Sequence, residues 1–160
     1  MKNIDWSNLP FGYMRTDYNV RCYYRNGEWG ALELCSEETI NLHMAATCLH
    51  YGQEGFEGLK AYRGKDGKIR IFRPEANAER LQSTCRGILM PELPTELFVN
   101  AVKKVVKANE RFIPPYESGA ALYIRPLLIG TSAQVGVHPA SEYLFVIFVT
   151  PVGPYYKDGF

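Results

Sequence analysis

The sequence of 160 residues predicts an α+β domain, in which two main helices pack against an antiparallel sheet. Extended segments come first, two helical segments follow one another, and extended segments then return, an order typical of this fold class. Turn signals at Asn26-Gly27 and at 64–67 join short extended segments into two hairpins. A chain of this length can bury a core without disulfides or metals. We therefore expect an N-terminal arm at 1–10 and one small domain over 11–152.

The first half of the domain is predicted to consist mainly of strands. Phe11 opens the first extended segment, and residues 18–35 form a hairpin around Asn26-Gly27. Residues 43–48 are predicted to be a short helix or an irregular segment. The second hairpin pairs 56–63 with 68–73. Alternation with a period of two places its apolar residues on one face: Leu59, Ala61, Ile69 and Ile71.

Two helices with apolar stripes are predicted in the middle of the chain. Pro74 suits the first position of a helix, because its missing N–H would be unpaired there anyway, and Pro91 ends that helix. The stripe of this helix is Ala78, Leu81, Cys85, Ile88 and Leu89. Thr95 is predicted to cap the second helix, which stops before Pro114. Its stripe is Leu97, Phe98, Ala101, Val102, Val105 and Val106.

Two strands are predicted to close the domain. Residues 120–129 are strand-like, and Pro126 indicates a sheet edge or a bulge, because proline cannot donate to a strand ladder. Within this strand, Tyr123 and Arg125 share one face. Residues 142–150 form a continuous apolar run, typical of a central strand buried on both faces. Residues 153–160 are predicted to begin an interdomain linker.

Composition excludes several classes of function. The formal net charge is +1, from 18 basic and 17 acidic residues, and no run of four basic residues occurs, so we expect no nucleic-acid partner. The four cysteines and three histidines lack metal-ligand spacing, and free thiols indicate a reducing compartment. The longest apolar run, 143–149, is too short to cross a bilayer. We expect a soluble cytoplasmic protein that binds no metal and no membrane.

A few residues resist a purely structural explanation. Arg125 lies between apolar residues in a strand, and a half-buried arginine needs an anionic partner. Arg80 lies in the N-terminal half of a helix, where it could meet a phosphate. The aromatics near segment ends, where pockets form, are Tyr51, Phe56, Tyr123, Tyr155 and Tyr156. Internal salt bridges and core packing remain open as alternatives. Glu54 and Glu57 are rejected as an acid/base pair, because residues three apart in a strand face opposite ways.

Three segments carry a resemblance to a known family: LHYGQEGFEGLKAYRGKDGKIRIFRPEANAERL, ALYIRPLLIG and YLFVIFVTPVGPYY. Together they resemble the N-terminal small domain of branched-chain amino acid aminotransferases, which are fold-type IV enzymes that use pyridoxal phosphate. The resemblance covers residues 6–160 in matching order and spacing. It implies exchange of the amino group between Leu, Ile or Val and 2-oxoglutarate.

The resemblance also implies roles for individual residues. Arg80 matches the arginine that holds the cofactor phosphate. Arg125 matches the arginine that accepts the side-chain carboxylate of glutamate, and Tyr123 matches the tyrosine near the substrate α-carboxylate. The residues matching the lining of the substrate pocket are Phe11, Tyr51, Phe56, Tyr123 and Tyr155. Those matching a loop that reaches the neighbouring subunit's site are Val135, Gly136 and Val137, so a homodimer is implied.

One departure from the family is large. None of the eight lysines matches the Schiff-base lysine, which in the family lies in a large C-terminal domain that is absent here. We therefore expect no catalytic residue in this chain, no activity from it alone, and poor retention of pyridoxal phosphate. A D-amino acid aminotransferase or an aminodeoxychorismate lyase of the same fold is an alternative. A binding or dimerisation module without catalysis is another.

Overall fold

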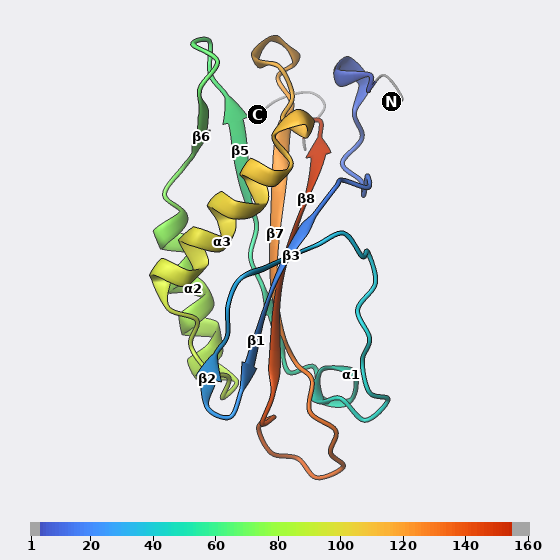
Figure 1. Cartoon of the computed structure of the whole chain (residues 1–160), viewed down its shortest axis with the longest axis vertical. Coiled ribbons are helices and arrows are strands. Elements are labelled where there is room, and N and C mark those ends of the chain that lie inside the picture. Colours follow the sequence, from blue (N-terminus) through green and yellow to red (C-terminus); the bar gives the residue numbers. More distant parts are fainter. Residues whose placement is uncertain (1–3, 155–160) are drawn as a thin grey trace.

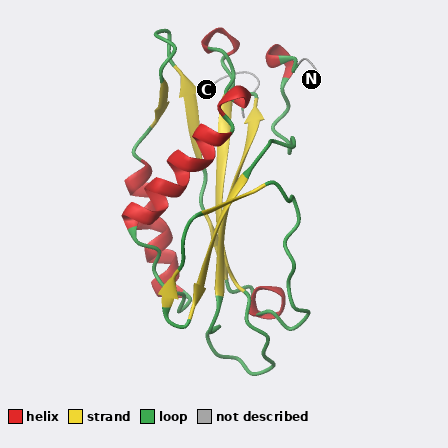
Figure 2. Cartoon of the chain, in the orientation of Figure 1, coloured by secondary structure: helices red, strands yellow, loops and turns green. Residues whose placement is uncertain are grey.

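One antiparallel sheet of eight strands organises the computed structural model, which describes residues 4–154 (Figures 1 and 2). The strands are β1 (Asn19–Arg25), β2 (Glu28–Trp29), β3 (Glu33–Cys35), β4 (Glu54–Phe56), β5 (Leu59–Arg63), β6 (Ile69–Ile71), β7 (Ala121–Gly130) and β8 (Tyr143–Val152). They follow the order β2-β1-β8-β7-β5-β6, with β3 paired to β1 and β4 paired to β7. The predicted α+β class is confirmed.

Two long helices lie together on one face of the sheet (Figure 1). The helices are α1 (Thr47–Tyr51), α2 (Pro74–Gly87) and α3 (Thr95–Ala108), with short 3-10 turns at Trp6–Asn8, Glu110–Phe112 and Tyr116–Ser118. The main core lies between α2, α3 and the sheet. Its fully buried residues from β7 and β8 include Leu122, Ile124, Leu128, Phe145 and Ile147. The predicted stripe of α3 is buried against them from Phe98 to Val106, as the helical period requires.

The first hairpin forms as predicted, with a break in its return strand. Asn26 and Gly27 have φ of 53° and 84°, the left-handed values that a two-residue hairpin turn needs. The return strand is divided into β2 and β3 by residues 30–32. The segment 43–48, predicted as a short helix or an irregular segment, is irregular at first and becomes helical at Thr47, where α1 begins.

The prediction that Pro126 lies at a sheet edge or a bulge is wrong, because β7 is an inner strand. The register on this side runs from Phe56 opposite Leu127 to Leu59 opposite Ile124, so Glu57 faces Pro126. The Glu57 N–H donates to the Pro126 carbonyl oxygen at 2.9 Å, and proline has no N–H to return. The predicted strand 56–63 is therefore divided into β4 and β5 at the position where the proline cannot donate.

The ends of the two long helices also differ from the predictions. Helix α2, predicted to end at Pro91, stops at Gly87. The Met90 N–H donates to the Cys85 carbonyl oxygen at 2.9 Å as the chain turns back. Leu89 adopts a φ of +56° in this turn and is 68 % exposed, so it does not continue the buried stripe. Thr95 is the first residue of α3 and caps nothing with its side chain. Its hydroxyl instead accepts a hydrogen bond from Gln82 of α2 at 3.2 Å, joining the two helices.

The other face of the sheet is covered unevenly. Residues from the long connection before α1, including Ile40 and Leu42, pack with Cys48 on Ile129 and Leu144 at one end of that face. Toward the other end, side chains of β7 and β8 border open pockets. No helix among residues 4–154 is long and apolar enough to cross a membrane.

The four thiols are free, and two of them are fully buried. Burial raises the pKa of Cys22, and burial with the nearby Glu92 charge raises the pKa of Cys85 to about 11. Because the thiolate is the reactive form, both thiols should resist iodoacetamide at pH 8 in the native protein and react after denaturation. Cys35, which is only partly buried, should react first. Mass spectrometry of native samples would contradict this if Cys85 were labelled as fast as Cys35.

Candidate functional site

An open pocket of about 270 Å³ lies on the face of the sheet opposite α2 and α3. Its lining residues come from the N-terminal segment, β7 and β8: Phe11, Gly12, Tyr13, Tyr123, Arg125, Phe148, Thr150 and Val152. The strands place these side chains because alternate residues of β7 and β8 face away from the helices. The structure thus brings together three of the predicted site residues, Phe11, Tyr123 and Arg125.

The Arg125 side chain is held by aromatic rings. Its guanidinium carbon lies 4.5 Å from the centre of the Phe56 ring and 5.2 Å from that of Tyr123. Its Nε donates to the Tyr123 hydroxyl oxygen at 3.1 Å. Among residues 4–154, no Asp or Glu forms an ion pair with Arg125. A partly buried cation without a carboxylate partner is suited to bind an anionic ligand.

Tyr123 depends on Gly58, a residue that sequence reasoning missed. The β4–β7–β5 register places Gly58 opposite Arg125, and a Cβ at Gly58 would lie 2.5 Å from the Tyr123 hydroxyl oxygen. Only glycine leaves room for the tyrosine to lie over the strand. A glycine inside a strand often marks such a close approach, so a signal was present in the sequence.

The aromatic side chains around the pocket are partly exposed. The Phe11 ring lies 5.4 Å from the Tyr123 ring and is 43 % exposed, while Phe56 is 62 % exposed. Tyr13 and Phe148, which sequence reasoning did not select, form a further edge-on pair with ring centres 6.0 Å apart. These rings give the pocket an apolar wall beside the Arg125 cation.

Arg80 has a different environment from Arg125. Its Nε and Nη2 donate to the two carboxylate oxygens of Glu57 at 2.8 and 2.6 Å. Glu57 is 3 % exposed, whereas the Arg80 side chain is 67 % exposed. The hydrogen bonds to Glu57 raise the pKa of Arg80, which stays charged. The internal salt bridge left open as an alternative therefore exists for Arg80.

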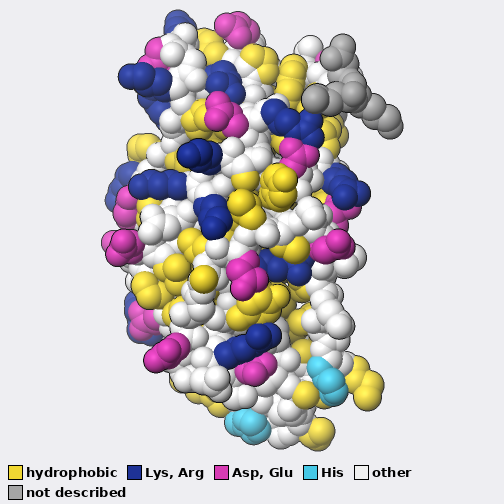
Figure 3. All heavy atoms as spheres, viewed as in Figure 1, with side chains coloured by type: hydrophobic (Ala, Val, Ile, Leu, Met, Phe, Trp, Pro, Cys, Tyr) yellow, Lys and Arg dark blue, Asp and Glu magenta, His cyan; other side chains and the backbone are white. Residues whose placement is uncertain are grey.

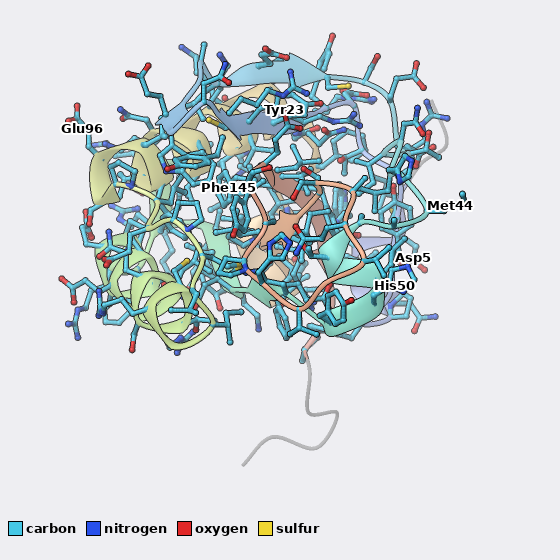
Figure 4. The ribbon with its side chains drawn as sticks, turned by 90° about the horizontal axis from the view of Figure 1, so that it is seen from below. Asp5, Tyr23, Met44, His50, Glu96 and Phe145 are labelled. Carbon is cyan, nitrogen blue, oxygen red and sulfur yellow. The ribbon has the colours of Figure 1, made fainter. Side chains whose placement is uncertain are left out.

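Tyr51 and the loop of Val135, Gly136 and Val137 lie together at the far end of the sheet, away from the pocket lined by Tyr123. The Tyr51 hydroxyl donates to the Val135 carbonyl oxygen. Both valines are at least 85 % exposed. Figure 3 shows hydrophobic side chains beside the histidines at this end. Seen from below in Figure 4, Met44 and His50 lie at the periphery while Phe145 lies inside.

Two further predictions concern Tyr155 as a lining residue and the binding of metal ions. Tyr155, predicted to line the pocket, lies outside the described residues, as does the segment 155–160. Among residues 4–154, no group of three or more His, Cys, Asp or Glu side chains is placed to hold a metal ion. The donors that the described part of the site offers are therefore cations, hydroxyls and aromatic faces.

Comparison with known proteins points to one family. No family model matches the chain. It is 53 % identical over 159 residues to a branched-chain-amino-acid aminotransferase of Haemophilus influenzae, covering 99 % of this chain and 46 % of that protein. It is 50 % identical to the Helicobacter pylori protein of the same name, covering 99 % of this chain and 47 % of that protein. The chain thus spans about half the length of these curated relatives.

Solved structures show the same likeness. The crystal structure of the Escherichia coli branched-chain amino acid aminotransferase matches with a TM-score of 0.68 and 25 % identity, over 88 % of this chain and 41 % of that one. A branched-chain aminotransferase from the archaeon Thermoproteus uzoniensis, solved with norvaline, matches with a TM-score of 0.66 and 26 % identity. That match covers 86 % of this chain and 43 % of the other.

Proposed function

We propose that this chain forms the small N-terminal domain of a branched-chain-amino-acid aminotransferase, because it is related to such enzymes over 99 % of its length. The small domain comprises residues 11–152, residues 1–10 form an arm, and residues 153–160 begin the linker to a larger domain. The complete enzyme exchanges the amino group of Leu, Ile or Val with 2-oxoglutarate. Other enzymes of this fold and a non-catalytic module are less favoured by the identities of the relatives.

The observation that carries the proposal is the arrangement around Arg125. One pocket must accept a branched apolar side chain in one half-reaction and a second carboxylate in the other. The rings of Phe11, Phe56 and Tyr123 favour the apolar side chain by burial. Arg125, which has no carboxylate partner among residues 4–154, is available for the second carboxylate.

The hydrogen bond between Arg125 and Tyr123 assigns the proton of the tyrosine. The Tyr123 oxygen accepts from Arg125 Nε, so its own O–H is free to donate elsewhere. An O–H beside a cation is a suitable donor to a substrate α-carboxylate. Gly58 holds this geometry by leaving space for the ring.

The donor set also fits pyridoxal phosphate, which when bound supplies the electron sink for amino-group transfer. The Arg80 side chain is two-thirds exposed, and its guanidinium is always charged and fixed along one edge by Glu57. Such a group can hold a phosphate with its remaining N–H groups. The rest of the enzyme must provide the lysine that binds the cofactor covalently.

We also propose that the enzyme is a cytoplasmic homodimer. Val135 and Val137 are exposed in a loop that Tyr51 holds at one end of the sheet, where a second subunit would cover them. Four free thiols are consistent with a reducing compartment.

The test compares the complete protein with the 160-residue chain, each incubated with pyridoxal phosphate. The complete protein should show the absorption of bound cofactor and transfer the amino group of leucine to 2-oxoglutarate. The isolated chain should do neither, because it lacks the expected lysine. Activity of the isolated chain, or a complete enzyme that prefers D-amino acids or aminodeoxychorismate, would overturn the assignment.

A further inference from the structure

Glu57 is a buried carboxylate with three donors gathered on it. Arg80 Nε donates to Oε1, while Arg80 Nη2 and Asn77 Nδ2 donate to Oε2 at 2.6 and 2.8 Å. Glu57 comes from the gap between β4 and β5, and both partners come from the first turns of α2. A buried charge requires such pairing, but burial alone does not require that its partner be exposed.

The arrangement fixes one edge of the Arg80 guanidinium and presents the other. A bidentate arginine–carboxylate pair determines the plane and direction of the guanidinium, which otherwise turns about a flexible side chain. Among residues 4–154, Arg80 forms its side-chain hydrogen bonds through Nε and Nη2, and Nη1 donates none. The Nη1 edge is therefore oriented yet available.

We propose that Glu57 is a positioning residue, which through Arg80 strengthens binding of the phosphate group of pyridoxal phosphate. The inference rests on the proposed function, because it takes Arg80 as the phosphate ligand. It adds a second residue, outside the pocket itself, on which the affinity for the phosphate depends. Asn77 supports the same carboxylate and acts one step further away.

Two opposing effects decide whether Glu57 strengthens or weakens the binding of the phosphate group. The Glu57 charge repels a phosphate, which alone would weaken binding. The carboxylate lies on the edge of the guanidinium away from the proposed ligand, so the positive charge of Arg80 stands between the two anions and offsets their repulsion. Solvent around the exposed Arg80 side chain screens part of what remains. Preorganisation of a long side chain, which avoids ordering it during binding, is not screened. We expect preorganisation to dominate.

The test measures the affinities of the complete protein for pyridoxal phosphate and for pyridoxal, which lacks the phosphate. Glu57→Gln should lower the affinity for pyridoxal phosphate about tenfold and change the affinity for pyridoxal less than twofold. An amide cannot replace this carboxylate, because its NH₂ group would face an Arg80 N–H on either oxygen position. In an Arg80→Ala background, Glu57→Gln should change neither affinity by more than twofold.

A milder variant and a matched control complete the experiment. Asn77→Ala leaves the ion pair between Arg80 and Glu57 in place and should lower the affinity for pyridoxal phosphate about threefold. This variant keeps the proposal testable if Glu57→Gln does not fold. Asp66→Asn breaks another bidentate pair, to Arg70 on the exposed hairpin, and should alter neither affinity.

The outcomes separate this inference from the function on which it rests. If the unaltered protein binds no pyridoxal phosphate, the proposed function fails. If it binds normally and Glu57→Gln binds as tightly or more tightly, Glu57 does not position Arg80. An equal loss of affinity for pyridoxal phosphate and pyridoxal would show a merely structural role and would also overturn the proposal.

Discussion

Replacing Arg125 with leucine in the complete protein is expected to lower kcat/KM for glutamate by two to three orders of magnitude. The value for leucine should fall less than tenfold. Arg125 is the cation of the pocket without a carboxylate partner among residues 4–154, so a second substrate carboxylate would lose its hydrogen bonds. Two charge-assisted hydrogen bonds contribute about 3–4 kcal/mol, which sets the size of the effect.

Two variants make the Arg125 experiment specific. Arg125→Lys keeps the charge but loses the planar fork and its stacking on Phe56, so activity toward glutamate should be only partly restored. Arg86→Leu removes an exposed arginine of α2 that pairs with Glu92, and both substrates should be unaffected. Equal losses toward glutamate and leucine in Arg125→Leu would mean that Arg125 does not discriminate between them.

Gly130→Ala is expected to destabilise the isolated chain by about 3 kcal/mol, which is the upper range for overpacking a core. Gly130 ends β7 where Thr47 and Gln53 approach its backbone. An added Cβ would meet the Thr47 hydroxyl, lie 2.9 Å from Gln53 Oε1 and lie 3.2 Å from Ala140 Cβ. Thr47 and Gln53 are buried, so neither side chain can move into open solvent. The melting temperature should fall by about 6–12 °C.

The matched control is Gly87→Ala, at the last residue of α2. A Cβ there would meet nothing within 4 Å, and alanine is the better helix former. This variant should be unchanged or more stable by about 0.5–1 kcal/mol. Chemical unfolding of both variants measures the contrast. Equal stability of the two would mean that the contacts around Gly130 relax without cost.

Local patterns predicted much of the fold. Alternation along 59–71 placed Leu59, Ala61, Ile69 and Ile71 on the core side, and the helical period identified the buried face of α3. Asn26-Gly27 predicted its hairpin through the backbone conformation that those residues favour. Errors occurred at helix ends, as at Leu89 and Thr95, where single hydrogen bonds decide the boundary.

The candidate site was predicted only in part. That Tyr123 and Arg125 share a face follows from the two-residue period of a strand, and the structure adds Phe11 and Phe56 beside them. The two-residue period separates Glu57 from Glu54, which excludes an acid/base pair but says nothing about partners of Glu57 on other elements. Its partner, Arg80, lies 23 residues further on, on a helix packed beside the strand.

The sequence by itself determined the fold class, the faces of the strands and helices, and the two arginines around which a site could form. These depend on periodicity and on the chemistry of neighbouring residues. Only the tertiary structure decided which arginine has a carboxylate partner, why Pro126 is tolerated in an inner strand and why residue 58 must be glycine. Those outcomes depend on the lateral order and register of the strands, and contacts between distant segments leave no periodic signal in the chain.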